Sequence, residues 1–286
     1  MDYLRVTSEV ELAAALREDG AVFHAGGTDL LVKMRAGAVR PRLLIDATHV
    51  DTLRLISDRP DGLWIGSGAL LEDVLASDAV RRDYPLLAAV LHSLGSVQIR
   101  NRATLGGNLA NASPAADGVL ALIAYDGKVA LATQTGERTL DVSEFVRGPG
   151  RTALAAGEYI RSIWLPAPRS DWVPFFHKVG RRQALTIAIA SVGGLLAQRD
   201  GVIVDVRVVA GSVAPAPLRL HPVEDLVVGR PVDRTLLATA SEAARKAVAP
   251  IDDVRASAPY RRDVIGDLVA RFLRQASGHT AGGASP

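Results

Sequence analysis

The chain has 286 residues, of which 48% are hydrophobic, so it can bury a substantial core divided over two or three compact parts. Its 33 basic and 31 acidic residues leave a formal charge of only +2, which argues against a nucleic-acid-binding face. Cysteine is absent, which excludes disulfides, thiolate catalysis and an iron–sulfur cluster held by this chain. The first residues lack a secretory signal pattern and no apolar run could span a bilayer, so we expect a cytoplasmic protein.

The first fifty residues predict a small βα unit with parallel strands. The expected elements are a helix at Val10–Leu16, strands at Ala21–Phe23 and Arg42–Asp46, and a helix that begins at Leu30. Ser8 precedes the first helix and Glu11 follows three residues later, which is the pattern of a capping box. Asp46 ends the second strand, where it is either a ligand group or the start of an Asx turn into Thr48.

The next stretch, up to residue 168, mixes hairpins with helical patterns. It predicts hairpins of Leu53–Ser57 with Leu63–Ser67 and of Lys128–Ala132 with Glu137–Leu140, a strand at Glu158–Pro166, and helices at Leu71–Ala76, Pro85–Leu91, Gly118–Tyr125 and Asp141–Phe145. Gly66-Ser67-Gly68 begins like a dinucleotide fingerprint but lacks the third glycine and follows a hairpin. We therefore expect no nicotinamide site there.

The remainder of the chain predicts a separate α+β unit. Its expected elements are strands at Phe175–Val179, Thr186–Ala197 and Val202–Val213, and helices at Arg234–Val248 and Arg261–Arg274. The last two strands should form a hairpin across Arg199-Asp200-Gly201. Residues 277–286 are small and polar, so we expect them to be disordered.

Two glycine-containing segments carry the chemistry. The first glycine segment, Ala25–Leu31, follows a strand and opens a helix that Thr28 or Asp29 can cap, so free N–H groups and the helix dipole favour a phosphate there. The second glycine segment, Thr104–Asn108, holds two adjacent glycines, where the backbone can approach a ligand and φ > 0 is available. Either segment alone could be an ordinary turn before a helix. Two of them about 80 residues apart could hold both phosphates of a dinucleotide.

Two arginines precede the second glycine segment. Arg100 and Arg102 either offset the charge of a pyrophosphate or border a solvated turn, and we favour the first interpretation slightly. No histidine pair has the spacing of metal ligands, and no nucleophile elbow or Walker loop is present. The sequence therefore indicates a cofactor-binding site without a nucleophile of its own.

The two glycine segments, continued by Ser113-Pro114-Ala115-Ala116-Asp117, resemble the two FAD loops of the medium, flavin-binding subunit of molybdenum hydroxylases. That is the xanthine dehydrogenase and carbon monoxide dehydrogenase family, and the resemblance extends to about residue 275. It implies an α+β fold. An FAD-binding domain of the PCMH (vanillyl-alcohol oxidase-like) type would span residues 1–168, with subdomains at about 1–52 and 53–168, and a smaller α+β domain would span 169–276.

The resemblance also implies which residues bind FAD. An apolar residue ten positions before the second glycine segment would help to hold the flavin, and an acidic residue after that segment would accept a ribose or ribityl hydroxyl. A lysine in Phe176–Arg182 would approach the cofactor. The implied cofactor-binding residues are Ala25, Gly26, Gly27, Thr28, Asp29, Leu30, Leu94, Thr104, Leu105, Gly106, Gly107, Asn108, Asp117 and Lys178.

One position departs from the family pattern. In many relatives an acidic residue and an aromatic residue follow the paired arginines, and the aromatic lies near the flavin ring. Leu185-Thr186 stands there in this chain. The departure leaves access to the ring, and with it the electron acceptor, open.

The implied function is electron transfer. Substrate would be hydroxylated at a molybdenum cofactor on a large partner subunit, and electrons would cross [2Fe-2S] clusters on a small partner before FAD on this chain passes them to NAD, a quinone or oxygen. A heterotrimer or its dimer is the family expectation. Two alternatives remain: a self-contained FAD oxidoreductase of the same fold superfamily, and a non-catalytic scaffold subunit.

Overall fold

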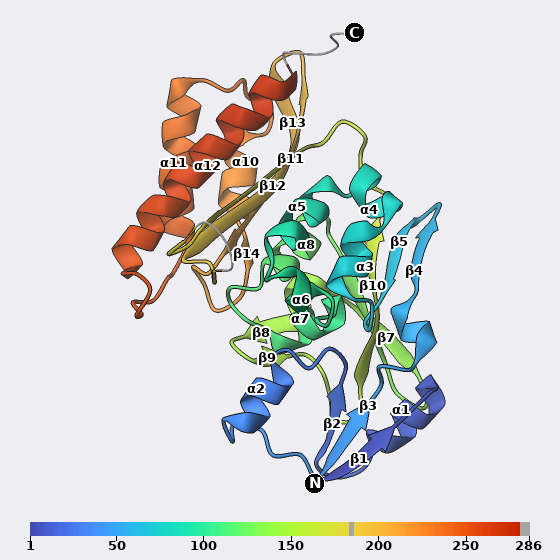
Figure 1. The fold of residues 1–286 in the computed structure, drawn as a ribbon. Helices are drawn as coiled ribbons and strands as arrows, with labels where there is room; N and C mark the ends of the chain where they lie inside the picture. The colour runs from blue at the N-terminus through green and yellow to red at the C-terminus, as the bar shows by residue number, and fades with distance from the viewer. Residues whose placement is uncertain (183–185, 281–286) are drawn as a thin grey trace. The chain divides into compact units, whose positions relative to one another are not determined.

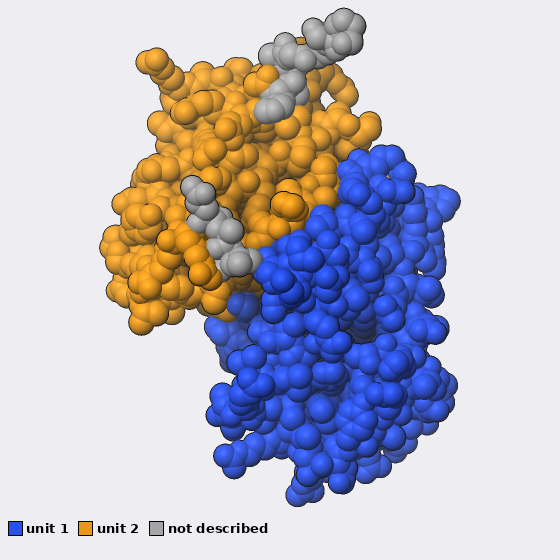
Figure 2. All heavy atoms as spheres, in the orientation of Figure 1, with its two compact units in different colours: residues 1–82, 94–113, 126–167 blue, residues 83–93, 114–125, 168–286 orange. Residues whose placement is uncertain are grey.

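The computed structural model describes residues 1–182 and 186–280 (Figure 1). Contacts within the chain define two compact units (Figure 2). Unit 1 comprises residues 1–82, 94–113 and 126–167, and unit 2 comprises residues 83–93, 114–125 and the chain from residue 168 onward. Both units combine sheets with helices, which confirms the predicted α+β class. The domain boundaries near residues 52, 168 and 276 stay a prediction.

Unit 1 begins with a three-stranded parallel sheet, as predicted for the βα unit. Its strands, in spatial order, are β1 (Asp2–Arg5), β3 (Leu43–Asp46) and β2 (Ala21–His24), and its helices are α1 (Glu9–Ala15) and α2 (Leu30–Arg35). The capping box is present: Ser8 Oγ accepts a hydrogen bond from Glu11 N at 3.2 Å, and the Glu11 carboxylate accepts backbone hydrogen bonds from Ser8 and, at 2.8 Å, from Thr7. Strand β1 was not predicted, because its residues are all exposed and its pairing with β3 defines it.

The second sheet of unit 1 has five antiparallel strands. In spatial order they are β4 (Ile56–Arg59), β5 (Gly62–Gly66), β10 (Tyr159–Pro166), β6 (Lys128–Ala132) and β7 (Glu137–Asp141). The predicted strand at Leu53–Ser57 is wrong in its first residues, because a 3-10 helix, η1 (Asp51–Arg54), takes them. Leu53 is buried there, and its carbonyl oxygen accepts a hydrogen bond from Gly68 N at 2.7 Å.

Short helices and one small two-stranded sheet complete this part of the chain. They are α3 (Leu71–Ala76), α4 (Asp78–Asp83), α6 (Val97–Arg100), α7 (Leu105–Asn111), α9 (Val142–Phe145), β8 (Val146–Gly148) and β9 (Arg151–Thr152). The predicted helices at Leu71–Ala76 and Asp141–Phe145 are confirmed, the latter without its first residue. Helices α4 and α6 were missed, because one turn or so of helix shows no clear hydrophobic period.

Unit 2 is built on an antiparallel sheet with helices on both faces. Its strands, in spatial order, are β11 (Val173–Val179), β12 (Ala190–Arg199), β13 (Val202–Gly211) and β14 (Leu218–Arg219). Its helices are α5 (Pro85–Ser93), α8 (Asp117–Ala124), α10 (His221–Val227), α11 (Arg234–Ala247) and α12 (Ala258–Thr280). Helices α11 and α12 lie alongside each other (Figure 1).

Two adjacent glycines of β12 explain how helices pack so closely on this sheet. A Cβ atom at Gly193 would lie 2.2 Å from Leu120 Cδ2 of α8, and one at Gly194 would lie 2.7 Å from Phe272 Cζ of α12. Successive strand residues point to opposite faces. Helices α8 and α12 therefore cover opposite faces of the sheet, although α8 comes from the first half of the chain.

Among the predicted boundaries in unit 2, the start of β12 and the end of α12 differ from the structure. β12 begins at Ala190 rather than at Thr186, and the carbonyl of Ala188 accepts the Ser212 hydroxyl at 3.0 Å instead of joining the ladder. Helix α12 continues past Ala276 to Thr280, where a disordered tail was expected. Ser277 Oγ donates to the carbonyl of Leu273 at 2.7 Å, so its hydroxyl is satisfied inside the helix. Residues 281–286 of the predicted tail lie outside the described residues.

Candidate cofactor site

Unit 1 contains a cavity of about 400 Å³ that is lined by both glycine segments. A volume of this order is typical of small-molecule and cofactor sites. The lining includes eleven of the fourteen predicted ligand residues: Ala25, Gly26, Gly27, Thr28, Asp29, Leu30, Leu94, Thr104, Gly106, Gly107 and Asn108. Apolar side chains from other elements close it, among them Phe23, Leu71, Leu154 and Ile160.

The first glycine segment is a tight turn between β2 and α2. Gly27 has φ of +73°, which L-residues with a side chain rarely adopt, and its carbonyl accepts a hydrogen bond from Leu31 N at 3.1 Å. Asp29 stands at the N-cap of α2, but its side chain makes no capping hydrogen bond with any described residue. The N-cap position falls on Asp29 and not on Thr28, and no side chain caps α2 among the described residues, so the predicted side-chain cap is wrong.

The second glycine segment is a helix start and not an open turn. Thr104 is the N-cap of α7, and its hydroxyl accepts a hydrogen bond from Gly107 N at 2.9 Å. Gly106 and Gly107 lie in the first turn of that helix, so the positive φ that the sequence made available is not used. Leu105 is fully buried and is not among the described residues that line the cavity.

The glycines of both segments also serve packing. A Cβ atom at Gly26 would lie 2.1 Å from the carbonyl oxygen of Arg102, and one at Gly106 would lie 2.5 Å from the backbone and side chain of Ser67. Gly107 differs from these two, since a Cβ there would meet Thr104 Oγ1 at 2.9 Å and its surface is exposed. At Gly26 and Gly106, the missing Cβ therefore allows close packing against other parts of the protein.

Two buried polar atoms that line the cavity have no hydrogen-bond partner among the described residues. They are Ser67 Oγ and Asn108 Oδ1. Leaving a buried donor or acceptor unpaired costs about 1–3 kcal/mol, so such atoms suit a polar ligand that would pair them. A dinucleotide with phosphate, hydroxyl and ring-carbonyl groups fits this donor and acceptor set. Ser67 was not predicted, although Gly66-Ser67-Gly68 was the signal that could have indicated it.

The arginine that was expected to offset a pyrophosphate is committed elsewhere. Arg100 is buried, and its Nε donates to Glu72 Oε2 at 2.7 Å. Its guanidinium also reaches the carbonyl oxygens of Leu94 and Gly95, at 3.4 and 3.5 Å. Arg100 thus holds the turn that carries Leu94, and the predicted phosphate role is wrong for it. Arg102 is exposed and contributes its carbonyl oxygen to the contact with Gly26.

Asp117 and Lys178, the last two predicted ligands, belong to unit 2 and bind each other. Lys178 Nζ donates to Asp117 Oδ2 at 2.9 Å and to the carbonyl of Ser93 at 3.0 Å. Ser191 Oγ lies 3.4 Å from the other carboxylate oxygen. Burial raises the pKa of Asp117, while the ammonium of Lys178 opposes that rise. Their roles as cofactor ligands stay predictions.

The position of the missing aromatic is partly described. Leu185 lies outside the described residues. Thr186 packs on Gly180, since a Cβ atom there would lie 2.1 Å from Thr186 Cγ2. The consequence for access to a flavin ring stays a prediction.

Asp46 resolves an alternative that the sequence left open. Its Oδ1 accepts hydrogen bonds from Thr48 N at 3.0 Å and Thr48 Oγ1 at 2.6 Å, so the Asx turn is confirmed. Its Oδ2 accepts the Tyr3 hydroxyl at 2.5 Å. Burial alone would raise the pKa of Asp46, but the hydrogen bonds from Thr48 and Tyr3 outweigh it and hold that pKa well below the ordinary value. Asp46 is thus a structural carboxylate that joins β3 to β1.

No three His, Asp or Glu side chains of the described residues gather as a metal site. No helix within residues 1–182 and 186–280 combines the length with the hydropathy that a bilayer-spanning helix requires. The fold and the cavity together define a class of protein that binds a dinucleotide-sized cofactor in an α+β unit.

Comparison with known proteins specifies this class. Residues 1–168 match the family model of the FAD binding domain in molybdopterin dehydrogenase, and residues 175–276 match that of the CO dehydrogenase flavoprotein C-terminal domain. The chain is 31% identical over 263 residues to the nicotine 6-hydroxylase medium subunit of Paenarthrobacter nicotinovorans, with 92% of each chain covered. It is 30% identical over 254 residues to the xanthine dehydrogenase FAD-binding subunit of Escherichia coli O157:H7, with 88% of this chain and 87% of that one covered.

A solved structure agrees. A chain of the carbon monoxide dehydrogenase from Hydrogenophaga pseudoflava, in a form that lacks the Mo-pyranopterin moiety, superposes with a TM-score of 0.93 at 28% identity, and 97% of both chains is covered. The chain therefore belongs to the FAD-binding family of molybdopterin dehydrogenases, and it is a flavoprotein medium subunit of a multi-subunit molybdenum hydroxylase. The predicted family, fold and FAD cofactor are confirmed.

Proposed function

We propose that this chain holds FAD in the cavity of unit 1 and transfers electrons from [2Fe-2S] clusters on a small partner subunit to an external acceptor. A large partner subunit with the molybdenum cofactor would oxidise the substrate. The observation that carries the proposal is the cavity itself, which both glycine segments line and in which Ser67 Oγ and Asn108 Oδ1 find no partner among the described residues. The family supports the same assignment.

The chain's own residues would bind and shield the cofactor. Bound FAD would supply the redox chemistry, because its ring takes up electrons singly or in pairs. The backbone of Gly26, Gly27 and Gly107 would face the phosphates, and the carboxylate of Asp29 would accept sugar hydroxyls. Apolar side chains such as Leu94 and Leu154 would keep water from the ring. Asp117 and Lys178 remain predicted ligands.

Substrate choice would lie outside this chain. Relatives of similar identity are medium or FAD-binding subunits of enzymes named for different compounds: nicotine at 31%, xanthine at 30% and glyceraldehyde at 28%. If the medium subunit selected the substrate, we would expect this chain to be clearly more similar to the relatives that share its substrate than to the others. We infer that the substrate of this complex is bound by the large partner.

The first experiment tests the cofactor. The purified chain should show the visible absorption of a flavin, and mass spectrometry should identify the released molecule as FAD. We predict that Gly107→Leu empties the site and leaves the protein folded, because Gly107 is exposed in the cavity and the new Cβ would press on one atom only, Thr104 Oγ1 at 2.9 Å, at the start of a short helix that tolerates leucine. Gly136→Leu is the matched control, since no described atom lies within 4 Å of a Cβ there. Normal FAD content in Gly107→Leu would contradict the assignment.

The second experiment tests electron transfer. In the complex co-purified with its partners, adding the substrate, which the large partner oxidises, should bleach the flavin absorbance of this chain because the flavin gains the electrons, and the external acceptor should restore it. The isolated chain with FAD should stay oxidised when the same substrate is added. Reduction of the isolated chain would favour the self-contained oxidoreductase instead, and a complex whose flavin is never reduced would favour a scaffold.

A further inference from the structure

Lys33 is a cation of the cavity that the glycine motifs do not include. It lies in α2, lines the cavity, and is half-buried. Its Nζ donates a hydrogen bond of 2.6 Å to Oδ1 of Asn111, which ends helix α7 and also lines the cavity. This bond joins α2, which follows the first glycine segment, to α7, which contains most of the second.

The remaining charges of the cavity show why Lys33 stands out. Glu158 lines the cavity, but its carboxylate is neutralised by Arg138, with an Nε to Oε1 distance of 2.6 Å, and it accepts Ala155 N at 2.7 Å. Asp29 is exposed, so solvent screens its charge. Lys33 is the one cation among the described lining residues, and its hydrogen-bond partner Asn111 is neutral.

An ammonium group held by a neutral acceptor keeps its full charge for a ligand. A hydrogen-bonded amide orients the lysine head without neutralising it, whereas a carboxylate in the same place would form an ion pair. The pyrophosphate of a dinucleotide carries two negative charges, and backbone N–H groups offer only partial positive charges to balance them. Lysine is a suitable point charge for phosphate.

We infer that Lys33, oriented by Asn111, is the phosphate-recognising cation of this cavity and sets its preference for a phosphate-bearing flavin. The inference rests on the proposed function, because it assumes that FAD occupies the cavity of unit 1. It deepens that proposal, since Lys33 and Asn111 are outside the motif residues that the family resemblance implied.

The test compares flavin affinities of the full-length chain after removal of its flavin. Titration of the apoprotein with FAD, followed by flavin fluorescence, should give an affinity that is about 10- to 100-fold weaker for Lys33→Met than for the wild type, as expected for loss of one charge-assisted hydrogen bond. Riboflavin, which has no phosphate, should bind both proteins equally. Arg35→Met is the matched control, because it removes one positive charge from the exposed side of the same helix.

Salt dependence and two further variants separate recognition from a structural role. Raising the salt concentration should weaken FAD binding to the wild type more steeply than to Lys33→Met. Lys33→Arg should keep both the affinity and the salt dependence. Asn111→Asp should weaken FAD binding as Lys33→Met does, because the new carboxylate would neutralise the ammonium group. If Lys33 only joined α2 to α7, the ion pair would strengthen that contact and FAD binding would not weaken. Circular dichroism establishes that each variant is folded.

The outcomes distinguish this inference from the proposed function. A wild-type chain that binds neither FAD nor riboflavin overturns both. A wild-type chain that binds FAD, together with a Lys33→Met variant of equal affinity and equal salt dependence, overturns the inference and leaves the proposed function standing. An equal loss of FAD and riboflavin binding in Lys33→Met also overturns it, because the loss would then not concern the phosphate.

Discussion

Replacing Gly26 with alanine tests how the two glycine segments are held together. An added Cβ would lie 2.1 Å from the carbonyl oxygen of Arg102, 2.8 Å from its carbonyl carbon and 2.9 Å from Cα of Ala103. All three neighbours are backbone atoms, so no side chain can rotate away to make room. The residues just before the second glycine segment would have to move away from the first one.

The expected cost follows from that displacement. Close contacts between carbon and a carbonyl oxygen are about 3.3–3.6 Å long, so the segments must separate by roughly 1 Å. Over-packing of this kind destabilises the folded state by about 1–3 kcal/mol. Alanine also lowers the conformational entropy of the unfolded chain, which stabilises the protein by about 0.4–1 kcal/mol and offsets part of that cost. We expect Gly26→Ala to lower the free energy of unfolding by about 1–2 kcal/mol, which corresponds to a fall in Tm of about 2–8 °C.

Thermal unfolding followed by circular dichroism measures this fall, and the FAD content of the purified protein reports the state of the cavity. Gly136→Ala is the control, because a Cβ there has no described atom within 4 Å. Gly26→Ala should melt below the control and retain less FAD. If Gly26→Ala melts with the wild type and keeps its FAD, the packing argument for this glycine is refuted.

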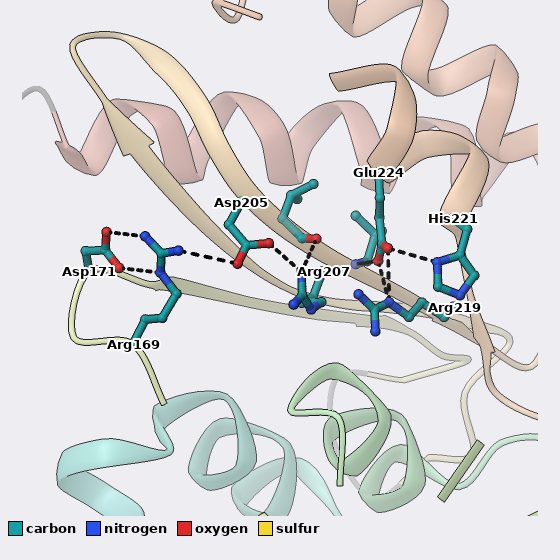
Figure 3. Close-up of polar contacts among 9 residues, drawn as sticks. Arg169, Asp171, Asp205, Arg207, Arg219, His221 and Glu224 are labelled. Atoms are coloured by element: carbon teal, nitrogen blue, oxygen red, sulfur yellow. Dashed lines mark hydrogen bonds and ion pairs between the residues drawn. The ribbon is translucent and has the colours of Figure 1, made fainter. Parts of the chain in front are cut away.

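Two further predictions concern carboxylates outside the cavity. The pKa of Asp46 is lowered on folding, so the unfolded chain binds its proton first and the stability that Asp46 contributes is lost as the pH falls below about 4. Asp46→Asn should flatten the fall of the urea midpoint over that acid range, and an unchanged profile would contradict this. Glu224, which is buried, accepts hydrogen bonds from Val208 N at 2.8 Å and Arg219 Nε at 2.9 Å (Figure 3). Glu224→Ala should lower the free energy of unfolding by about 3 kcal/mol and Glu224→Gln by less, and equal stability of all three proteins in urea would refute it.

The elements that sequence reasoning predicted well are those fixed by local chemistry. The hairpin of β12 and β13 turns at Asp200 and Gly201, whose φ values of +51° and +78° suit an Asp-Gly turn. Helix α1 begins at the capping Ser8, because the hydroxyl and the first free N–H groups are neighbours in sequence. Such features need no knowledge of the rest of the fold.

The elements that were missed depend on partners far along the chain. Strand β1 has no buried side chain, and its register with Leu43–Asp46 gives it its structure. Likewise, α5 and α8 were predicted as helices, but their place on the sheet of unit 2 depends on Gly193 of β12, where a Cβ atom would meet Leu120 of α8 and Leu86 of α5, and only the packing reveals this. Hydrophobic period identifies an element and does not say which sheet it covers.

The candidate site divides in the same way. Eleven of the fourteen predicted residues line one cavity, and Gly26 lets the first glycine segment pack against Arg102 and Ala103, directly before the second. Lys33 and Glu158 could not be assigned from sequence, since a lysine in a helix and a glutamate before a strand are usually solvated. Arg100 was misassigned for the related reason that its partner, Glu72, lies 28 residues away.

The glycines of this motif acquire a second meaning in the structure. Gly26 faces the carbonyl of Arg102 and Gly106 faces Ser67, so each lets one part of unit 1 pack closely against another. Gly107 and Gly27 differ, the first by its exposure in the cavity and the second by its positive φ. The glycines that the sequence groups into one phosphate-binding motif therefore have different roles: some allow close packing, and others shape the surface of the cavity. Substitutions at Gly26 should change stability and FAD binding together, whereas substitutions at Gly107 should separate them, and that difference is what distinguishes assembly of the cavity from recognition of the cofactor within it.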